Sequence, residues 1–456
     1  MHLAIIAAPR PTTPRTPRQT FKTAARFAFA AASIASVLIP VAGCGNTYRP
    51  IVAAINPVGP AGQPQKYAVA VSSSPTPNTP GLMTLVDFSG DTILVTPQVG
   101  VSPYYLQLDS AGFTGFTFNG DGTLTSFDIS TTLQTQNVVQ TTLLPGANPV
   151  SLFALNGGSL YIAEPGRSAI GQFKGFPPSL QQEFTVPANP VYVVGVAGAP
   201  RAYGISQGNP AGNGSIAAIE TTSNTISTTL PVGKGPVYGV MTSDGRRAFI
   251  LNKTDGTVTV VNSQTNQLDI LPVGVTNPIT VGTAPIWADL DPAITELVVA
   301  NAGNGTSPGS VSIISIPLCS SSALPTNPNC DLNNPIDAVG FGTVLATVPV
   351  GHNPVMVSVL QDGITPRAYV ANYADSTVSV VNLITNTVTA TIPVVGRPIY
   401  IAATTGTPTG KVYVVSADII APNENSVMTV IRTDIDAVST TINLQGIGVS
   451  VRVTAP

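Results

Sequence analysis

The stretch RAYVANYADSTVSVVNLITNTVTATIPV, from Arg367 to Val394, alternates apolar and polar residues in three bursts. Small polar turns separate the bursts. Alternation over such short runs predicts β-strands that each have one buried face. The stretch is therefore either a lone hairpin region or one copy of a repeated unit.

Seven copies of a proline followed by an apolar strand show that the unit is repeated. They are SPYYLQLD at Pro103, NPVSLFAL at Pro149, NPVYVVGV at Pro190, GPVYGVMT at Pro236, APIWADLD at Pro285, NPVMVSVL at Pro354 and RPIYIAAT at Pro398. Further apolar bursts follow each proline, so each unit supplies four short strands. Four antiparallel strands that repeat every 40 to 50 residues or so are typical of a β-propeller, an all-β fold.

The two ends of the repeated region complement each other. The segment from Lys66 to Val95 supplies three strands without an opening strand, and Gly448 to Pro456 supplies an opening strand with nothing after it. Pairing the C-terminal strand with the N-terminal blade would remove two exposed sheet edges. With Val449 as the last opening strand, the sequence predicts eight closed blades; seven blades or a frayed last strand are the alternatives.

The first 43 residues differ from the repeats. They carry five basic residues and no acidic one, and an apolar run from Phe27 to Gly43 follows the basic part. This order predicts an export signal. The run ends in VAGC, which resembles the lipobox of bacterial lipoproteins and implies cleavage before Cys44 and a lipid on Cys44. An ordinary secretory signal and an uncleaved membrane anchor are the alternatives.

The domain organisation follows from this boundary. We expect a signal peptide over 1–43, a Pro- and Gly-rich tether over 44–63 and the propeller over 64–456, with an inserted loop at about 317–342. The chain has 19 basic and 22 acidic residues; losing five basic ones leaves 14 against 22, a net charge of −8. An acidic exported chain has no electrostatic basis for binding nucleic acid.

The repeat itself resembles a known family. The stretch YVANYADSTVSVVNLITNTVTATIPV, with Tyr369-Val370-Ala371-Asn372 at its start, is similar to the repeat of YVTN-type β-propellers. FILN at Phe249 and VVAN at Val298 are weaker versions. The family includes bacterial envelope and surface-layer proteins, and related propellers include lactonases and quinoprotein subunits. The resemblance implies a propeller outside the cytoplasm and leaves the activity open.

Large aromatic residues recur two positions after the marker proline. First strands line the channel of a propeller, so these residues are candidates for a ligand-facing channel mouth: Tyr105, Tyr192, Tyr238, Trp287 and Tyr400. Tyrosine and tryptophan would stack on sugars or other flat ligands. The alternative is packing between blades.

Other repeated or unusual polar residues have structural interpretations. The asparagines that end the second strands are expected to cap turns, and the alternative is that they present amides around one face: Asn119, Asn252, Asn301 and Asn372. His352 stands where other copies have an ordinary linker residue. The sequence contains no phosphate-binding glycine loop, haem-attachment motif or zinc spacing, so we expect no cofactor and no metal.

Cys319 and Cys330 lie eleven positions apart in the insertion. After export, two neighbouring cysteines are expected to form a disulfide. The insertion would then be either a recognition loop or an inert decoration.

These features favour a non-catalytic binding or scaffolding module, held at the membrane by a lipid on Cys44. The expected partner is an envelope protein or glycan, and the expected location is the outer membrane or the cell surface; a periplasm-facing position is the alternative. A propeller enzyme, such as a lactonase-like hydrolase or a quinoprotein-like oxidoreductase, is the alternative function, by analogy of fold.

Overall fold

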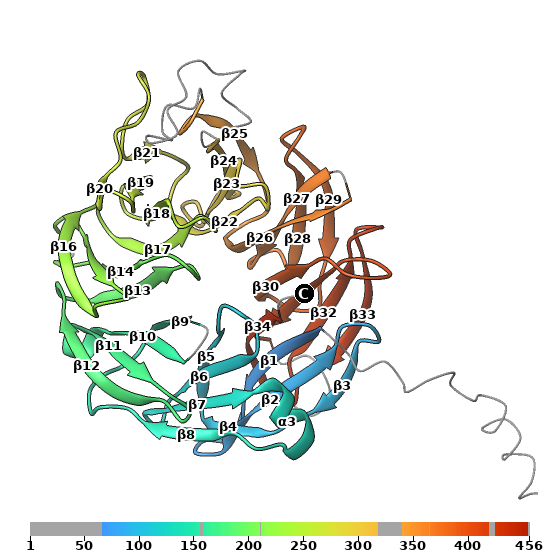
Figure 1. Cartoon of the computed structure of the whole chain (residues 1–456). Helices are drawn as coiled ribbons and strands as arrows, with labels where there is room; N and C mark the ends of the chain where they lie inside the picture. The colour runs from blue at the N-terminus through green and yellow to red at the C-terminus, as the bar shows by residue number, and fades with distance from the viewer. Residues whose placement is uncertain are drawn as a thin grey trace, which may run out of the picture. The chain divides into compact units, whose positions relative to one another are not determined.

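The computed structural model describes residues 66–155, 158–209, 211–317, 340–363, 365–418 and 425–454. These residues form eight antiparallel sheets arranged as blades around a centre, which is a β-propeller (Figure 1). The prediction of eight blades is confirmed. The signal, the tether, all three cysteines and most of the insertion lie outside the described residues, so the predictions for Cys44, Cys319 and Cys330 remain predictions.

Each blade contributes four strand positions, ordered from the innermost to the outermost. The first blade is β34 (Ile447–Val453), β1 (Tyr67–Ser73), β2 (Pro80–Asp87) and β3 (Thr92–Val95) with β4 (Gln98–Val101). The next three are β5 (Pro103–Leu108), β6 (Thr114–Asn119), β7 (Thr123–Asp128) and β8 (Val139–Thr142); β9 (Ser151–Leu155), β10 (Ser159–Glu164), β11 (Ala169–Lys174) and β12 (Ser179–Thr185); and β13 (Pro190–Gly195), β14 (Arg201–Ser206), β15 (Ser215–Glu220) and β16 (Thr225–Pro231).

The remaining four blades follow the same order. They are β17 (Pro236–Met241), β18 (Arg247–Asn252), β19 (Thr257–Asn262) and β20 (Gln267–Leu268) with β21 (Ile279–Thr280); β22 (Pro285–Leu290), β23 (Glu296–Asn301), β24 (Ser310–Ser315) and β25 (Val344–Pro349); β26 (Pro354–Asp362), β27 (Thr365–Asn372), β28 (Thr377–Asn382) and β29 (Thr387–Pro393); and β30 (Pro398–Thr404), β31 (Lys411–Ser416), β32 (Val427–Arg432) and β33 (Ala437–Asn443). The short helices α3 (Ile129–Thr135) and η1 (Pro165–Arg167) lie in connections.

The ring closes as expected. Strand β34 pairs antiparallel with β1, with Val451 opposite Ala70, so the last strand of the chain completes the first blade. The amine of Lys411, on β31 of the preceding blade, donates to the carboxylate of Asp91 at 2.8 Å. The hydroxyl of Tyr413 donates to the same carboxylate at 3.2 Å. Closure therefore combines a β-ladder with side-chain bonds between the first and last blades.

The core lies between neighbouring blades, because the middle strands are buried on both faces. On β27, Ala368 and Val370 belong to the hydrophobic cluster on one side of the blade, and Tyr369 and Ala371 to the cluster on the other. Outer strands such as β16 and β25 alternate between exposed residues and half-buried ones. Each blade thus buries apolar surface only against its two neighbours, as in other repeat folds.

The marker prolines sit where a strand can accept them. In six blades the pairing of the innermost strand shifts directly after the proline, as between Pro398 and Tyr400. The innermost strand is an edge of its sheet, so the missing proline N–H breaks no ladder bond. The proline and the shift together set which residues of the strand face the channel.

The prediction that the repeated asparagines cap turns is wrong. Each is buried at the end of a second strand and bonds across to the third: the Asn372 amide donates to Thr377 Oγ1 at 3.0 Å and to Ser379 Oγ at 2.9 Å. Asn119, Asn252 and Asn301 make corresponding bonds. A Cβ on Gly351 would lie 2.6 Å from Asn372, which explains the glycine in the VG motif before the marker proline. The asparagines are structural and do not present amides on a face.

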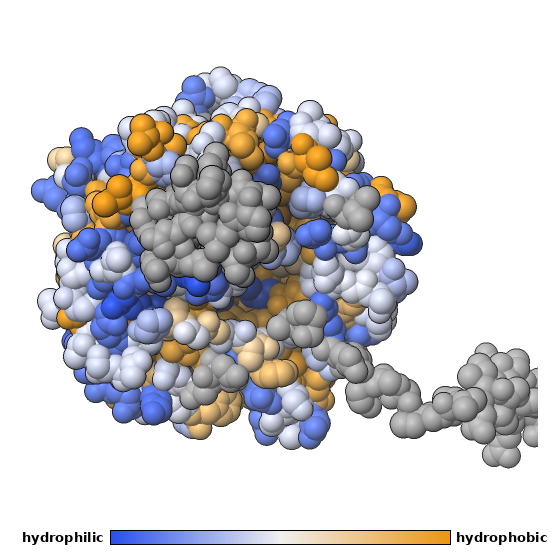
Figure 2. Space-filling view, turned by 45° about the horizontal axis from the view of Figure 1, so that its top comes forward, coloured by the Kyte–Doolittle hydropathy of each residue, from blue (hydrophilic) through white to orange (hydrophobic). Residues whose placement is uncertain are grey.

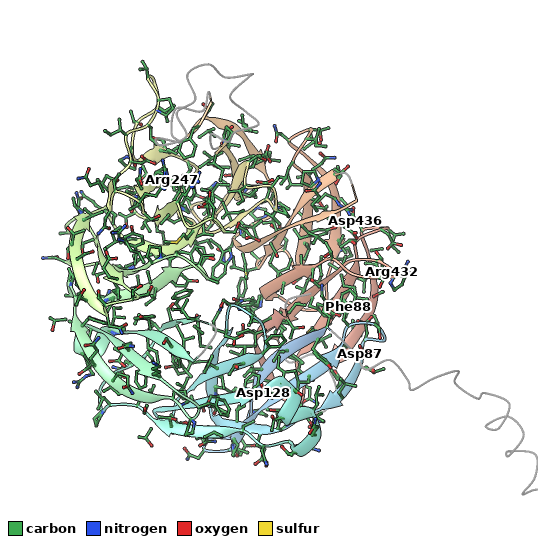
Figure 3. All side chains as sticks on the ribbon, in the orientation of Figure 1. Asp87, Phe88, Asp128, Arg247, Arg432 and Asp436 are labelled. Atoms are coloured by element: carbon green, nitrogen blue, oxygen red, sulfur yellow. The ribbon has the colours of Figure 1, made fainter. Side chains whose placement is uncertain are left out.

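Two further polar features stabilise the blades. Arg247 is fully buried in the blade that contains β17 to β21, where it forms an ion pair with the equally buried Asp269 (Figure 3). On the blade that contains β26 to β29, the Tyr369 hydroxyl donates to Asp436 of the next blade at 2.8 Å. Tyr161 and Tyr203 make the same kind of bond to Asn224 and Asn266. These bonds orient each blade against its neighbour.

Hydrophobic and hydrophilic residues are interspersed on the face shown in Figure 2. Within the described ranges, no helix is both long and apolar enough to cross a membrane.

Candidate functional site

The innermost strands surround the centre of the ring (Figure 1). Aromatic side chains on four of them contact one another in series and form a continuous wall. The ring centroids of Tyr192 and Tyr238 lie 4.7 Å apart. Tyr238 stacks on Trp287 at 4.1 Å and 25°, and Trp287 meets the edge of Tyr400 at 6.0 Å and 76°. Four of the five predicted aromatic residues are therefore brought together in the channel.

The fifth, Tyr105, stacks on a residue of its own blade and on none of these four rings. Its ring stacks on Phe118 of its own blade at 5.1 Å, and its hydroxyl accepts a hydrogen bond from the Leu152 N–H of the next blade at 3.2 Å. Ser151 and Ser358 accept from the backbone N–H groups of Val193 and Ala403 in the same way, at 3.3 and 3.1 Å. Innermost strands are sheet edges, so these side chains satisfy N–H groups that have no ladder partner.

The tyrosines of the wall are held as neutral phenols. Burial raises the pKa of Tyr192 and of Tyr238 well above the usual value, and each is further raised by a neighbouring tyrosine. Arg452 opposes both shifts, because a nearby positive charge favours the phenolate. Arg452 belongs to β34 of the first blade, so its charge acts on these tyrosines from another blade of the ring.

Arg452 is a channel residue that the sequence analysis missed. Its Nε and Nη2 both donate to Gln107 Oε1, at 3.0 and 2.9 Å, and its guanidinium carbon lies 4.4 Å from the centroid of the Tyr400 ring. It was missed because the sequence comparison covered only the residue two positions after each marker. Gly448 pairs with Ser72 as Pro398 pairs with Ser416, so Arg452 stands four positions after the residue that replaces the marker proline, as Gln107 stands four positions after Pro103.

Asp289 is an acidic group on the same level of the channel. Its carboxylate accepts hydrogen bonds from the N–H of Leu290 at 2.9 Å and of Val359 at 2.8 Å. Burial raises the pKa of Asp289 to about 6, against the lowering effect of these two bonds. Asp289 thus serves as an edge-strand acceptor and makes that side of the channel negative at neutral pH.

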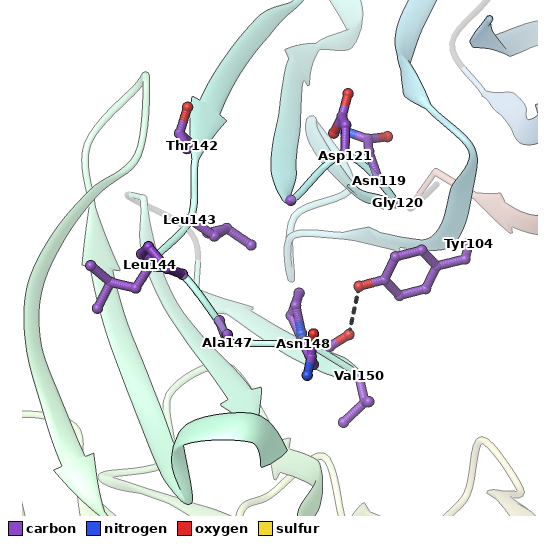
Figure 4. Close-up of a pocket in the computed structure, with 14 residues that line it drawn as sticks. Tyr104, Asn119, Gly120, Asp121, Thr142, Leu143, Leu144, Ala147, Asn148 and Val150 are labelled. Carbon is purple, nitrogen blue, oxygen red and sulfur yellow. Dashed lines mark hydrogen bonds between the residues drawn. The ribbon is translucent and has the colours of Figure 1, made fainter. Parts of the chain in front are cut away.

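A cavity of about 330 Å³ adjoins this cluster, lined by Gln107, Tyr192 and Tyr238 among others. A second hollow of about 570 Å³ lies between the second and third blades (Figure 4). There the Tyr104 hydroxyl donates to the Pro149 carbonyl at 2.8 Å, and burial raises the pKa of Tyr104 to about 12. The first cavity differs in being lined by two rings of the aromatic wall and by Gln107, the partner of Arg452; Asp109 also lines it.

A buried carboxylate outside the channel is also unusual. Glu164 is fully buried at the position that asparagine occupies in four other blades, and neither carboxylate oxygen has a hydrogen-bond partner among the described residues. Its cross-strand neighbours are Ala169 and Gly171, which carry no hydroxyl. Burial raises the pKa of Glu164 to about 7, the Glu183 carboxylate adds to the shift, and Arg167 opposes it. Burial therefore disfavours the ionised form of this carboxylate.

His352 belongs to the linkers, as the sequence analysis expected. Its ring nitrogen Nδ1 lies 3.0 Å from Asp375 Oδ1. The backbone N–H of His352 donates to Oδ2 of the same carboxylate at 2.7 Å. Arg397 and Asp418 make the equivalent pair in the next blade. Among the described residues, no three His, Cys, Asp or Glu side chains are grouped to hold a metal ion.

Comparisons with known proteins agree on the architecture alone. No family model matches the chain, and no curated protein matches it in sequence. Apo AztD from Citrobacter koseri is similar in structure, with a TM-score of 0.54 and 13% identity over 85% of this chain and 97% of that one. Dihydro-heme d1 dehydrogenase NirN in complex with DHE has a TM-score of 0.56 and 11% identity over 87% of this chain and 76% of that one. At these identities the likeness shows the propeller fold and no shared activity.

Proposed function

We propose that this protein is a YVTN-type, lipid-anchored propeller that acts as a non-catalytic binding module in the bacterial envelope. The export pattern before Cys44 and the lipobox-like VAGC support the anchor and the location. The observation that carries the binding role is the continuous wall of Tyr192, Tyr238, Trp287 and Tyr400 beside a cavity of about 330 Å³.

The mechanism is rigid display. Each side of the wall is fixed by a closed ring of blades, so the aromatic faces are already in place before a ligand arrives. Binding then loses little ordering entropy, which is the general advantage of a preorganised site. The half-buried rings of Tyr192, Trp287 and Tyr400 present flat apolar surface of the kind that stacks on sugar rings or protein side chains.

The test is cross-linking of the full-length protein in its native envelope, followed by mass spectrometry of the captured partner. Trp287→Leu combined with Tyr400→Leu should reduce capture by about tenfold or more, since losing two stacking faces removes at least about 1.4 kcal/mol. Phe113→Leu is the matched control, because Phe113 is 68% exposed and lies outside the channel. Capture that persists unchanged in the double variant would show that the wall is structural packing.

A further inference from the structure

The channel contains an arginine whose charge is not neutralised by the protein. The structure describes eight arginines, and seven of them form an ion pair with a carboxylate: Arg167, Arg201, Arg246, Arg247, Arg367, Arg397 and Arg432. Arg452 is the exception among these eight. Its bonds go to the neutral amide oxygen of Gln107 and to the face of Tyr400.

We propose that Arg452 anchors the carboxylate of an acidic sugar unit, such as a uronic acid at the end of a glycan, in this channel. The inference rests on the proposed binding role of the same site and names the class of its ligand. Neither the aromatic wall nor the arginine alone would specify this class.

The position of Arg452 is suited to capturing an anion. Two of its nitrogens donate to Gln107 Oε1, which holds the guanidinium plane without cancelling its charge. Stacking on Tyr400 fixes the plane from the other side. A planar, fixed guanidinium is the side chain best matched to a carboxylate.

The surroundings fit a sugar ring attached to that carboxylate. Gln107, which holds the guanidinium of Arg452, lines the same cavity as Tyr192 and Tyr238, so phenol rings with their hydroxyls lie beside the partner of the arginine. The aromatic faces of Tyr192, Tyr238 and Trp287 continue from that place around the channel. Sugars require this combination of apolar faces and hydroxyl partners. The adjoining cavity of about 330 Å³ is near the lower end of the range for ligand pockets, which fits one sugar unit.

Asp289 gives the site a direction. Asp289 lies on β22 and bonds to Val359, whereas Arg452 lies on β34 and bonds to Gln107, so the negative and positive groups are held on different blades. An anionic group is repelled from Asp289 and attracted to Arg452. The carboxylate of the ligand is therefore placed toward β34 and β5, and its neutral hydroxyls toward β17 and β22.

Trp287 provides a fluorescence signal for this test, because it is the only tryptophan of the chain and forms part of the wall. Tryptophan fluorescence of the purified full-length protein is titrated with glucuronate, with glucose as the neutral analogue of the same shape, and with acetate as the carboxylate alone. We expect a saturable change with glucuronate below about 10 mM and at least about tenfold weaker responses with glucose and acetate.

Arg452→Gln should weaken glucuronate binding by at least about tenfold, and Arg452→Lys should retain part of it, because lysine keeps the charge without the fork. Arg432→Gln is the matched control, since Arg432 pairs with Asp434 outside the channel. Unfolding midpoints of all variants show that each is folded. Equal glucuronate binding in Arg452→Gln, or equal responses to glucose, would overturn the carboxylate anchor.

Two further outcomes separate this inference from the proposed function. Benzoate that binds through Arg452 while glucuronate does not would contradict the sugar class. Partner capture in the envelope that depends on Trp287 and Tyr400 but not on Arg452 would contradict this inference and leave the binding module intact.

Discussion

Glu164 is expected to make the stability of the protein fall as the pH rises from about 4.5 to about 7. Its carboxylate is fully buried, has no hydrogen-bond partner among the described residues and has a pKa raised from 4.5 to about 7. Between these two values the unfolded chain loses this proton while the folded chain keeps it. The unfolded state is therefore favoured progressively from about pH 4.5 to pH 7, with no further change above.

The magnitude follows from the shift. Each unit of pKa difference corresponds to about 1.36 kcal/mol, so a rise from 4.5 to about 7 amounts to about 3 kcal/mol. Glu164→Gln removes the ionisation and keeps the shape of the side chain. The free energy of unfolding of the variant, minus that of the natural protein, should increase by about 3 kcal/mol between about pH 4.5 and pH 8.

The assay is urea unfolding of both proteins at intervals of about one pH unit from pH 5 to pH 8. Glu220→Gln is the control: although burial acts to raise it, the pKa of Glu220 is lowered by hydrogen bonds from Arg201 and Ser227. Its effect on stability should be constant over this range. A difference between Glu164→Gln and the natural protein that does not change with pH would refute the reasoning.

Three other predictions concern the ring and its bonds. Removing residues 447–456 should expose the edge of the first blade and lead to aggregation, seen by size-exclusion chromatography. Arg247→Met should lower the free energy of unfolding by about 3 to 5 kcal/mol, and adding Asp269→Leu should recover most of it, because the loss comes from a buried unpaired charge. A disulfide between Cys319 and Cys330 should raise the intact mass by two hydrogens on reduction; an unchanged mass would show free thiols.

The repeat could be read from the sequence because its determinants are local. The alternation in Arg367 to Val394, the proline that opens each unit and the polar turns all lie within about 45 residues of one another. Blade number and closure follow from counting such units. The role of the asparagines was predicted incorrectly, because their partners are hydroxyls across a strand pair and the sequence does not show which way a buried amide points.

The candidate site depended on the tertiary structure. The sequence identified Tyr192, Tyr238, Trp287 and Tyr400 as one repeated position, but their stacking distances depend on how far apart the closed ring holds its blades. Arg452 and Gln107 are 345 residues apart in sequence and meet only because the last strand completes the first blade. Local patterns decide strands and turns, whereas the charge and shape of a channel arise from residues that only ring closure brings together.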